Sequence, residues 1–487
     1  MKPRTREFKT LAVKALADPG LQKAIATANQ SFQVSRAAAV AAVPEWEALR
    51  ERSARIKDEA LDRLPECLEA LERRIAIRGG TVHWAETGDD ACRLVIDIAR
   101  RAGARLAVKS KSMVGEEIGL NHALEGAGIE SVETDLGEFI IQLAGETPSH
   151  IITPAIHKSR GEIAALLHEK IGSPPGADIP VMTRAAREVL RAKFLAAGVG
   201  ISGVNFAVAE TGTLVVVENE GNARLTTTLP PVHIAIMGFE KVVPRAADLA
   251  ILLKLLCRSA TGQAVGTYVS CIGGPRPAGS ADGPTALHLI ILDGGRSRIW
   301  ADPHQRASLR CIRCGACLNF CPVYERIGGH AYGWVYPGPI GSVITPGFLG
   351  AGEARDLPRA SSLCGRCAEV CPVRIPLPEL LLARRAEDVE APASGPGRGE
   401  RWLMRLFAFT VTSPWRFALA RAAARLFLRP ILRRNPSARL PGMPGAWTAG
   451  RDFPLPPPAS EGFRRQWRKL SRELESAREP GKGGARP

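Results

Sequence analysis

The chain has 487 residues, 45% of them hydrophobic, which is enough for two or three domains with cores of their own. Apolar residues never fill eighteen consecutive positions, so no membrane-spanning helix is predicted. The net charge of +16 lies mostly in residues 391–487, where nineteen Lys and Arg face six Asp and Glu. A nucleic-acid-binding body is therefore not expected, and the sequence predicts a basic C-terminal segment with its own partner.

In chain order, residues 1–70 are charged and predict helices with a break at Pro44. From 71 to 293, β-rich runs alternate with helical stretches, and Ser159 and Glu162 form a capping box at one helix start. Strands are predicted over 105–108, 149–153, 213–218, 232–237, 265–270 and 286–292. Helices are predicted over 113–126, from 159, over 184–197 and over 245–259. This alternation predicts an α/β domain with a largely parallel sheet.

The segment from Gly198 to Gly203 matches G-x-G-x-x-G. A dinucleotide-binding fingerprint needs a strand before it and a helix after it. Here a helix is predicted before the glycines and a strand after them, and Gly198 is interpreted as the glycine that ends the helix. No nucleotide cofactor is therefore predicted.

Residues 294–390 predict a separate, mostly helical domain that contains seven of the eleven cysteines. The first run reads C-x2-C-x2-C-x3-C-P and comprises Cys311, Cys314, Cys317 and Cys321. The second run also ends in Cys-Pro and comprises Cys364, Cys367 and Cys371. The first spacing is the ligand pattern of bacterial-type [4Fe–4S] ferredoxins, so the two runs predict two neighbouring iron–sulfur clusters.

Zinc is the alternative ligand, because C-x2-C pairs also bind zinc. Zinc sites usually use two pairs set well apart, whereas three closely spaced cysteines followed by a fourth and a proline favour iron–sulfur. No secretory signal is recognised, so a reducing, cytoplasmic compartment without disulfides is expected. The remaining cysteines are interpreted as small buried hydrophobic residues: Cys67, Cys92, Cys257 and Cys271.

The fourth cysteine of such a run usually binds the other cluster. On that rule, the ligands of the first cluster are Cys311, Cys314, Cys317 and Cys371. Those of the second cluster are Cys321, Cys364 and Cys367. The second set is one thiolate short, because Ser361 stands where the second run would have its first cysteine. The second cluster is then a three-iron cluster, a four-iron cluster with an open iron, or one completed by Ser361, Ser362 or a partner.

Five residues of the α/β domain are candidates for catalysis or ligand binding. Glu210 has small neighbours that let a ligand approach, while Glu218 and Arg224 flank a glycine turn. Lys109 and Lys111 follow a predicted strand at the carboxyl edge of the sheet, where α/β domains bind ligands, and could hold a carboxylate or phosphate. The alternatives are a hairpin with solvated charges and a pair of solvated lysines.

The C-terminal segment begins with a predicted linker over 391–400. Residues 402–428 alternate arginines with apolar residues and are interrupted by Pro414. Such a stretch could lie on an anionic membrane surface or dock on an acidic subunit, and the short helix lengths favour docking. Residues 435–460 are Pro-rich and predicted irregular, and 463–478 predict a charged helix with a disordered end.

Much of residues 70–390 resembles the lactate utilisation protein B family. The matching segments are 109–113, 133–140, 205–212, 219–224 and both cysteine runs. The resemblance implies a LUD domain over 71–293, with a fold like CoA transferases and ribose-phosphate isomerases. It further implies an α-helical ferredoxin domain over 294–390, followed by the basic helical segment 391–487. The family pattern also has seven cysteines.

The resemblance implies an electron-transfer subunit, with two [4Fe–4S] clusters, of a complex that oxidises L-lactate to pyruvate. Its partners would be a cysteine-rich subunit like those of heterodisulfide reductase and a small LUD-domain protein. Such a chain is an oxidoreductase component rather than a stand-alone enzyme, located in the cytoplasm or also in peripheral contact with the inner face of the membrane. Two alternatives stay open. One is a CoA-transferase-like enzyme with Glu210 or Glu218 as nucleophile and structural or regulatory clusters. The other is a scaffold subunit for another 2-hydroxy acid oxidoreductase.

Overall fold

The structure is a computed structural model that describes residues 3–390, 398–434, 459 and 461–478. The chain forms two compact units, Met1–Ser394 and Gly395–Pro487, which are described separately. The first unit contains the strands and all seven cysteines of the two runs.

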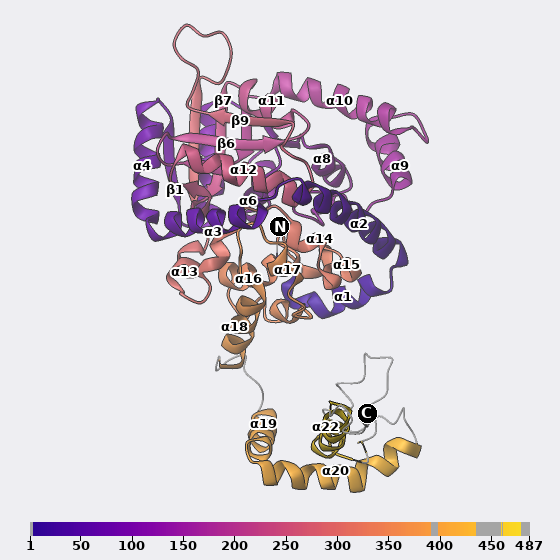
Figure 1. Cartoon of the computed structure of the whole chain (residues 1–487). Coiled ribbons are helices and arrows are strands. Elements are labelled where there is room, and N and C mark those ends of the chain that lie inside the picture. The colour runs from indigo at the N-terminus through magenta and orange to yellow at the C-terminus, as the bar shows by residue number, and fades with distance from the viewer. Residues whose placement is uncertain (1–2, 391–397, 435–458, 460, 479–487) are drawn as a thin grey trace, which may run out of the picture. The chain divides into compact units, whose positions relative to one another are not determined.

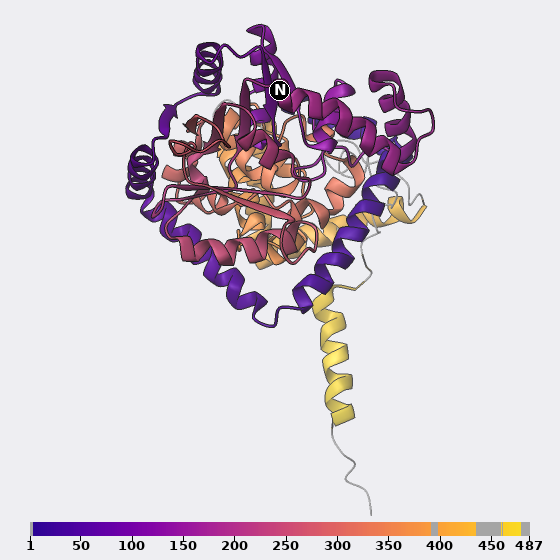
Figure 2. The ribbon, with the colours of Figure 1, turned by 90° about the horizontal axis from the view of Figure 1, so that it is seen from above.

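The N-terminal residues form helices, as predicted: α1 (Phe8–Leu16), α2 (Pro19–Ala41), α3 (Trp46–Asp62) and α4 (Leu64–Ile77). The break at Pro44 is confirmed, because α2 ends at Ala41 and α3 begins at Trp46. Asp18 caps α2 by accepting a hydrogen bond from the Leu21 N–H at 2.9 Å. Figures 1 and 2 show α2 and α3 running along the side of the first unit, where they contact both its strand-containing part and its cysteine loops.

A six-stranded parallel sheet forms the centre of residues 81–292, which confirms the predicted α/β class. Its strands, in spatial order, are β1 (Thr81–Ala85), β10 (Ala286–Leu292), β7 (Val232–Gly238), β4 (Val199–Gly203), β2 (Leu106–Lys109) and β3 (Glu130–Glu133). The inner strands are almost wholly buried, as expected for a parallel sheet covered on both faces. Covering helices include α5 (Gly88–Arg101), α7 (Leu120–Gly126), α8 (Leu136–Leu143) and α10 (Ile179–Ala196). The predicted capping box of Ser159 and Glu162 is present at the start of α9 (Arg160–Ile171).

A second, four-stranded mixed sheet was not separated from the first by sequence reasoning. Its order is β8 (Val242–Val243), β5 (Phe206–Val208), β6 (Thr213–Glu218) and β9 (Tyr268–Ile272). Strands β5 and β6 form an antiparallel hairpin, and α12 (Ala246–Ala260) packs on the sheet together with α3 and α4. Strand periodicity identifies strands, but it does not say which sheet each one joins.

The predicted strand over 149–153 is wrong, because this segment is a buried loop that packs on the cysteine-containing part. The Tyr324 hydroxyl donates to the Ser149 carbonyl oxygen at 2.8 Å, and the Gly329 N–H donates to Ser149 Oγ at 3.2 Å. The predicted helix over 113–126 is divided into α6 (Met113–Glu117) and α7 by Gly119, whose φ is 68°. The apolar character of 149–153 is explained by burial against the cysteine-containing part rather than by strand pairing.

The glycine-rich segment lies as predicted, with helix α10 before it and strand β4 after it. Gly198 follows the helix but lies outside the left-handed region. At Gly200, a Cβ atom would lie 1.8 Å from the carbonyl oxygen of Thr226, at the end of α11 (Asn222–Thr228). This close approach of helix to strand explains the need for glycine without a nucleotide.

Within its described residues 294–390, the cysteine-containing part consists of helices, turns and loops, with no strand. Its helices are α13 (Arg296–Ala301), α14 (Ala316–Asn319), α15 (Pro322–Ile327), α16 (Gly338–Leu349), α17 (Arg366–Glu369) and α18 (Leu377–Glu390). Three 3-10 turns lie between them: η3 (Arg306–Arg310), η4 (His330–Tyr332) and η5 (Leu357–Arg359). At the N-terminus, η1 (Thr5–Glu7) precedes α1, which packs on η4.

The second unit contains α19 (Arg398–Val411), α20 (Pro414–Arg434) and α22 (Phe463–Arg478). The interruption at Pro414 is confirmed, since α20 begins there. The predictions for 391–397, 435–458 and 479–487 lie outside the described residues. A search of the described helices finds none long and apolar enough to cross a membrane.

Arg296 joins the two parts of the first unit and is fully buried. Its guanidinium donates to both carboxylate oxygens of Glu117 at 2.8 Å and to Glu240 Oε2 at 2.7 Å. Tyr336 donates to Glu117 at 2.6 Å, and Phe348 lies 4.7 Å below the guanidinium. Burial opposes ionisation of Glu240, but Arg296 and Arg313 lower its pKa to about 2. The charges at this boundary are therefore matched in pairs.

We expect Arg296→Gln to lower the free energy of unfolding by about 3–5 kcal/mol, because two buried carboxylates lose their cation. Chemical denaturation of the anaerobically purified protein, followed by tryptophan fluorescence, measures the loss. The control is Arg55→Gln, which removes an exposed ion pair with Glu51 and should change stability by no more than about 1 kcal/mol. Equal stability of the two variants would contradict this role of Arg296.

Candidate iron–sulfur centres and the adjoining pocket

Four cysteines from both runs line one small cavity: Cys311, Cys314, Cys317 and Cys371. Its other walls are mostly apolar and include Ile151, Ile340 and Ile375. The first three thiols come from the loop before α14 and from α14 itself, and the fourth comes from the loop after α17. The structure thus brings together the residues that sequence reasoning assigned to the first cluster.

The charges that act on the thiols mostly follow the same two groups, although Cys367 of the second group also raises the pKa of Cys317. Desolvation raises the pKa of Cys314 and raises that of Cys371 to about 11, and each is raised further by nearby thiolates of the first group. Desolvation also raises the pKa of Cys367 to about 12, with Cys321 and Cys364 as its charged neighbours. Converging buried thiolates oppose one another unless positive charge is placed among them. Bound iron supplies that charge, so these residues fit an iron–sulfur cluster.

The backbone around the thiols has the geometry of a sulfur cradle. The Arg313 N–H donates to Cys311 Sγ at 3.4 Å, and the Ile375 N–H donates to Cys371 Sγ at 3.4 Å. Three non-glycine residues of the described chain have positive φ, and all three lie in the cysteine loops: Arg313, Leu363 and Arg374. Such backbone costs about 1–3 kcal/mol per residue and concentrates at functional sites.

The two cysteine runs form the same local structure at an offset of fifty residues. Arg313 and Leu363 have φ of 59° and 55°, and each precedes a Cys-Gly pair and a four-residue helix. In the first run the Arg313 N–H donates to Cys311 Sγ. In the second, the Leu363 N–H donates to Ser361 Oγ at 3.1 Å. Ser361 Oγ therefore occupies the position that corresponds to a ligand sulfur.

The two groups of thiols differ in exposure. Cys314 and Cys371 are buried, and the loop around His150 covers the first run. In the second group Cys321 and Cys367 are buried, whereas Cys364 is exposed. Cys311 and Cys317 of the first group are half-buried, so the first group is more enclosed than the second, whose Cys364 is exposed.

Helices α2 and α3 fix the cysteine loops, a role that sequence reasoning missed. Arg50 donates to the carbonyl oxygens of Cys371 at 2.9 Å and Ala368 at 3.1 Å. Ser53 donates to the Pro372 carbonyl at 2.6 Å, and Gln33 donates to that of Asn319 at 2.7 Å. These bonds satisfy carbonyl groups at the ends of short helices. The sequence signal for this role was the presence of polar residues, such as Arg50 and Ser53, on the inner face of an otherwise amphipathic helix.

Two of the five candidate residues, Lys111 and Glu218, line one cavity of about 330 Å³ at the carboxyl end of the sheet. Lys111 Nζ donates to the Ile152 carbonyl at 2.6 Å. Both Glu218 oxygens accept backbone N–H groups, from Ala223 and Arg224, at 2.7 Å. Glu218 therefore also caps helix α11.

The other three candidates lie elsewhere. Glu210 is exposed and accepts a hydrogen bond from the N–H of Ala246, at the start of α12. Arg224 lies over the ring of Tyr268. Lys109 is fully buried rather than solvated, and its Nζ lies 2.5 Å from Glu133, which keeps its pKa above the usual range despite desolvation.

The two arginines within the cysteine loops have different surroundings. Arg313 is buried, and despite the opposing effect of desolvation the charge of Cys311 raises its pKa. Arg366 is exposed and pairs with Glu369 at 3.0 Å. Of the two arginines, only Arg313 has its charge directed at the neighbouring cysteines.

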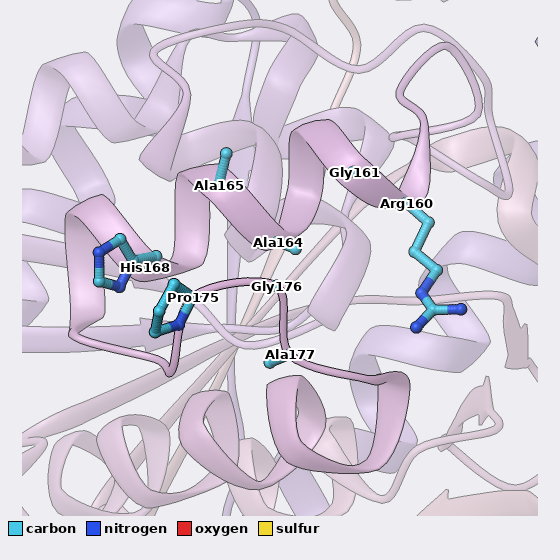
Figure 3. A pocket seen from close by; sticks show the side chains of 8 residues that line it. All are labelled: Arg160, Gly161, Ala164, Ala165, His168, Pro175, Gly176 and Ala177. Carbon is cyan, nitrogen blue, oxygen red and sulfur yellow. The ribbon is translucent and has the colours of Figure 1, made fainter.

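Other hollows offer less chemistry. Figure 3 shows one between α9 and the turn before α10, lined mostly by small residues, with the Arg160 side chain at its edge. Elsewhere Glu146, His157 and His330 have ligand-type atoms within 4.8 Å of one another. Lys158 Nζ pairs with Glu146 at 2.6 Å, so the ammonium group already neutralises that carboxylate, and we assign no metal there.

Comparisons with known proteins agree with this architecture. Residues 68–292 match the LUD domain, and 307–375 match the 4Fe-4S dicluster domain. The chain is 43% identical to the "Uncharacterized electron transport protein YkgF" of Escherichia coli (strain K12), over 96% of this chain and 98% of the relative. It is 42% identical to "Lactate utilization protein B" of Shouchella clausii, with the same coverage, and 41% identical to that of Bacillus velezensis, over 94% and 96%.

A solved structure of a DUF162-family protein from Deinococcus radiodurans covers 47% of this chain and 98% of its own. It is 16% identical, with a TM-score of 0.27, which is too low to support an argument. The domain matches define a LUD-domain protein with a 4Fe-4S dicluster domain. The identity to full-length relatives shows that the chain belongs to the lactate utilization protein B family.

Proposed function

We propose that this chain is the iron–sulfur electron-transfer subunit of a complex that oxidises L-lactate to pyruvate. The observation that supports this most directly is that four thiols line one mostly enclosed cavity, beside a second group of thiols that includes the exposed Cys364. Iron–sulfur clusters accept and release single electrons, and oxidation of a 2-hydroxy acid releases two. The relatives' names, electron transport protein and lactate utilization protein B, support the same role.

The proposal includes two [4Fe–4S] clusters with the ligand sets assigned above. The exposed Cys364 marks the side on which a redox partner would approach, because electron transfer requires the centres to lie close together. The partners we propose are the cysteine-rich subunit and the small LUD-domain protein. A cytoplasmic location fits seven reduced thiols held for metal rather than for disulfides.

A fold like CoA transferases and ribose-phosphate isomerases is part of the proposal for residues 71–293. The transferase alternative gains no support from its candidate nucleophiles, because Glu210 and Glu218 accept hydrogen bonds from the N-termini of α12 and α11. These hydrogen bonds hold both carboxylates in place at the helix ends.

The first test is the visible absorbance of the clusters in the assembled complex under anaerobic conditions. Added L-lactate should bleach it, and D-lactate serves as a comparison. Cys314→Ser should remove one cluster and abolish lactate-dependent electron flow, because Cys314 is one of four thiols around a single cavity. Cys271→Ser, an exposed cysteine outside both runs, is the control and should leave both clusters. A Cys314→Ser protein with two clusters and full activity would contradict the proposal.

For the second cluster, we expect the Ser361 hydroxyl to supply the fourth ligand, because its oxygen lies where the first run has a sulfur. Ser361→Ala should shift the cluster from four iron atoms toward three, and Ser361→Cys should keep four. Iron and sulfide quantitation with EPR spectroscopy distinguishes these states. Ser362→Ala, which changes the exposed neighbour, is the matched control. An unchanged spectrum in Ser361→Ala would assign the position to Ser362 or to a partner.

The second unit fits a docking role. Helices α19 and α20 expose large aromatic side chains, including Trp402, Phe407, Phe409 and Trp415, among their arginines. Aromatic residues and arginine are enriched at protein interfaces, and arginine pairs well with carboxylates. An acidic surface of a partner subunit is therefore the proposed target.

Deletion of residues 391–487 should weaken association with the partner subunits while both clusters remain, since all seven cysteines lie in the first unit. Co-purification from cells that express all three subunits measures association, and iron content measures the clusters. Normal co-purification of the shortened protein would contradict docking. Loss of binding to vesicles of anionic phospholipid, with subunit association intact, would instead support the membrane alternative.

A further inference from the structure

The cavity at the carboxyl end of the central sheet extends to the first cysteine loop. It has a volume of about 330 Å³ and is lined by the turns that follow β2, β4 and β6. Arg313 and Tyr336 of the cysteine-containing part complete its wall. Ligands of α/β domains bind at this end of the strands, so the position itself is suited to a substrate.

The cavity is separated from the first cluster site by single side chains. Ile151 and Arg313 line both this cavity and the small one formed by the four thiols. A molecule bound here would therefore lie next to the first cluster site. No comparable link to the second group is seen among the residues that line either cavity in the described chain.

Two buried cations face the cavity with unused hydrogen-bonding capacity. Lys241 is 7% exposed, and the charges of Glu240 and Cys311 act on it, but no hydrogen bond from its Nζ is found within the described residues. Arg313 is 8% exposed, and its Nη1 has no partner in the same part of the chain, while Nη2 reaches Glu240 at 3.4 Å. Glu240 acts on both cations but also pairs with Arg296 at 2.7 Å, so the positive charge at this point is only partly offset, which favours binding of an anion.

The other large buried cations of the first unit already have partners. Lys109 lies against Glu133 and Glu116, and Arg296 lies between Glu117 and Glu240. Lys57 donates to two carbonyl oxygens, at 2.5 and 3.2 Å. Unpartnered nitrogen atoms are also found at Nε of Arg36 and Arg306, but these side chains are only partly buried and do not line the cavity.

The remaining walls define the size and character of the ligand. Val204 and Ile236 provide apolar surface, and the Ser110 hydroxyl is buried, without a hydrogen-bond partner in the described structure. Glu218 and Glu220 also line the cavity, and their carboxylates disfavour ligands with several negative charges. A small monoanion with a short apolar group and one hydroxyl or oxo group matches these features.

From this arrangement we infer that the cavity binds a small 2-hydroxy or 2-oxo carboxylate, with its carboxylate on Lys241 and Arg313 and its oxygen substituent near Ser110. The inference rests on the proposed function and deepens it, because it places the substrate site in this subunit. The substrate would then be held between the sheet and the first cluster site.

The test measures binding of L-lactate and pyruvate to the full-length, cluster-loaded protein by anaerobic calorimetry. Lys241→Met should weaken binding at least about tenfold, because a charge-assisted contact is lost, and Lys241→Arg should retain most of it. Ser110→Ala, which removes only the hydroxyl oxygen, should weaken binding about three- to tenfold. Lys254→Met, which removes an exposed lysine paired with Glu45, is the matched control and should bind normally.

Three results would overturn the inference. One is undiminished binding in both Lys241→Met and Ser110→Ala. Another is a Lys241→Met protein that binds lactate normally but shows a changed cluster EPR spectrum in the absence of ligand. That result would assign Lys241 the role of balancing the charge of the cluster. The third is equal affinity for inorganic phosphate, which would indicate a general anion site. If this subunit alone binds no lactate but the complex is still bleached by it, the site fails and the proposed function stands. Absence of bleaching would instead reject the proposed function.

Discussion

The structure depends on one electrostatic constraint: thiolates from distant parts of the chain converge in an apolar interior. Cys371 lies fifty residues after the end of the first run, yet it lines the same cavity as Cys311, Cys314 and Cys317. Burial and mutual repulsion raise the pKa values of Cys314, Cys317 and Cys371, so the arrangement is unfavourable until positive metal charge offsets it. The surrounding protein must therefore fix the loops firmly.

That support comes from all parts of the first unit. The N-terminal helices donate hydrogen bonds to loop carbonyls, and the loop around His150 covers the first run. His150 accepts backbone N–H groups at Nδ1, and desolvation lowers its pKa to about 3, so it remains neutral beside Asn319. A neutral histidine adds no charge next to the candidate cluster. The LUD domain and the dicluster domain thus share one interior, which explains how the cavity at the end of the sheet and the cavity lined by four cysteines lie side by side.

Sequence patterns predicted much of this. The parallel sheet, the helices before Pro44, the break at Pro414 and the helical character of the cysteine-containing part follow from local periodicity and turn chemistry. Misassigned segments, such as 149–153, are those whose burial comes from another domain. The catalytic candidates show the same limit: Lys109 and Lys111 are two residues apart, but one is enclosed by carboxylates and the other lines the cavity.

By itself, the sequence determined the chemistry: the spacing of the seven cysteines specifies thiolate ligands for iron, and the LUD and dicluster segments specify the family. Tertiary structure alone decided which groups meet. Lys241 and Arg313 are seventy-two residues apart and lie in different domains, yet they face one cavity. The spacing of ligands within a loop is a local property that the chain records directly. The meeting of two buried cations depends on domain packing, which no local pattern encodes.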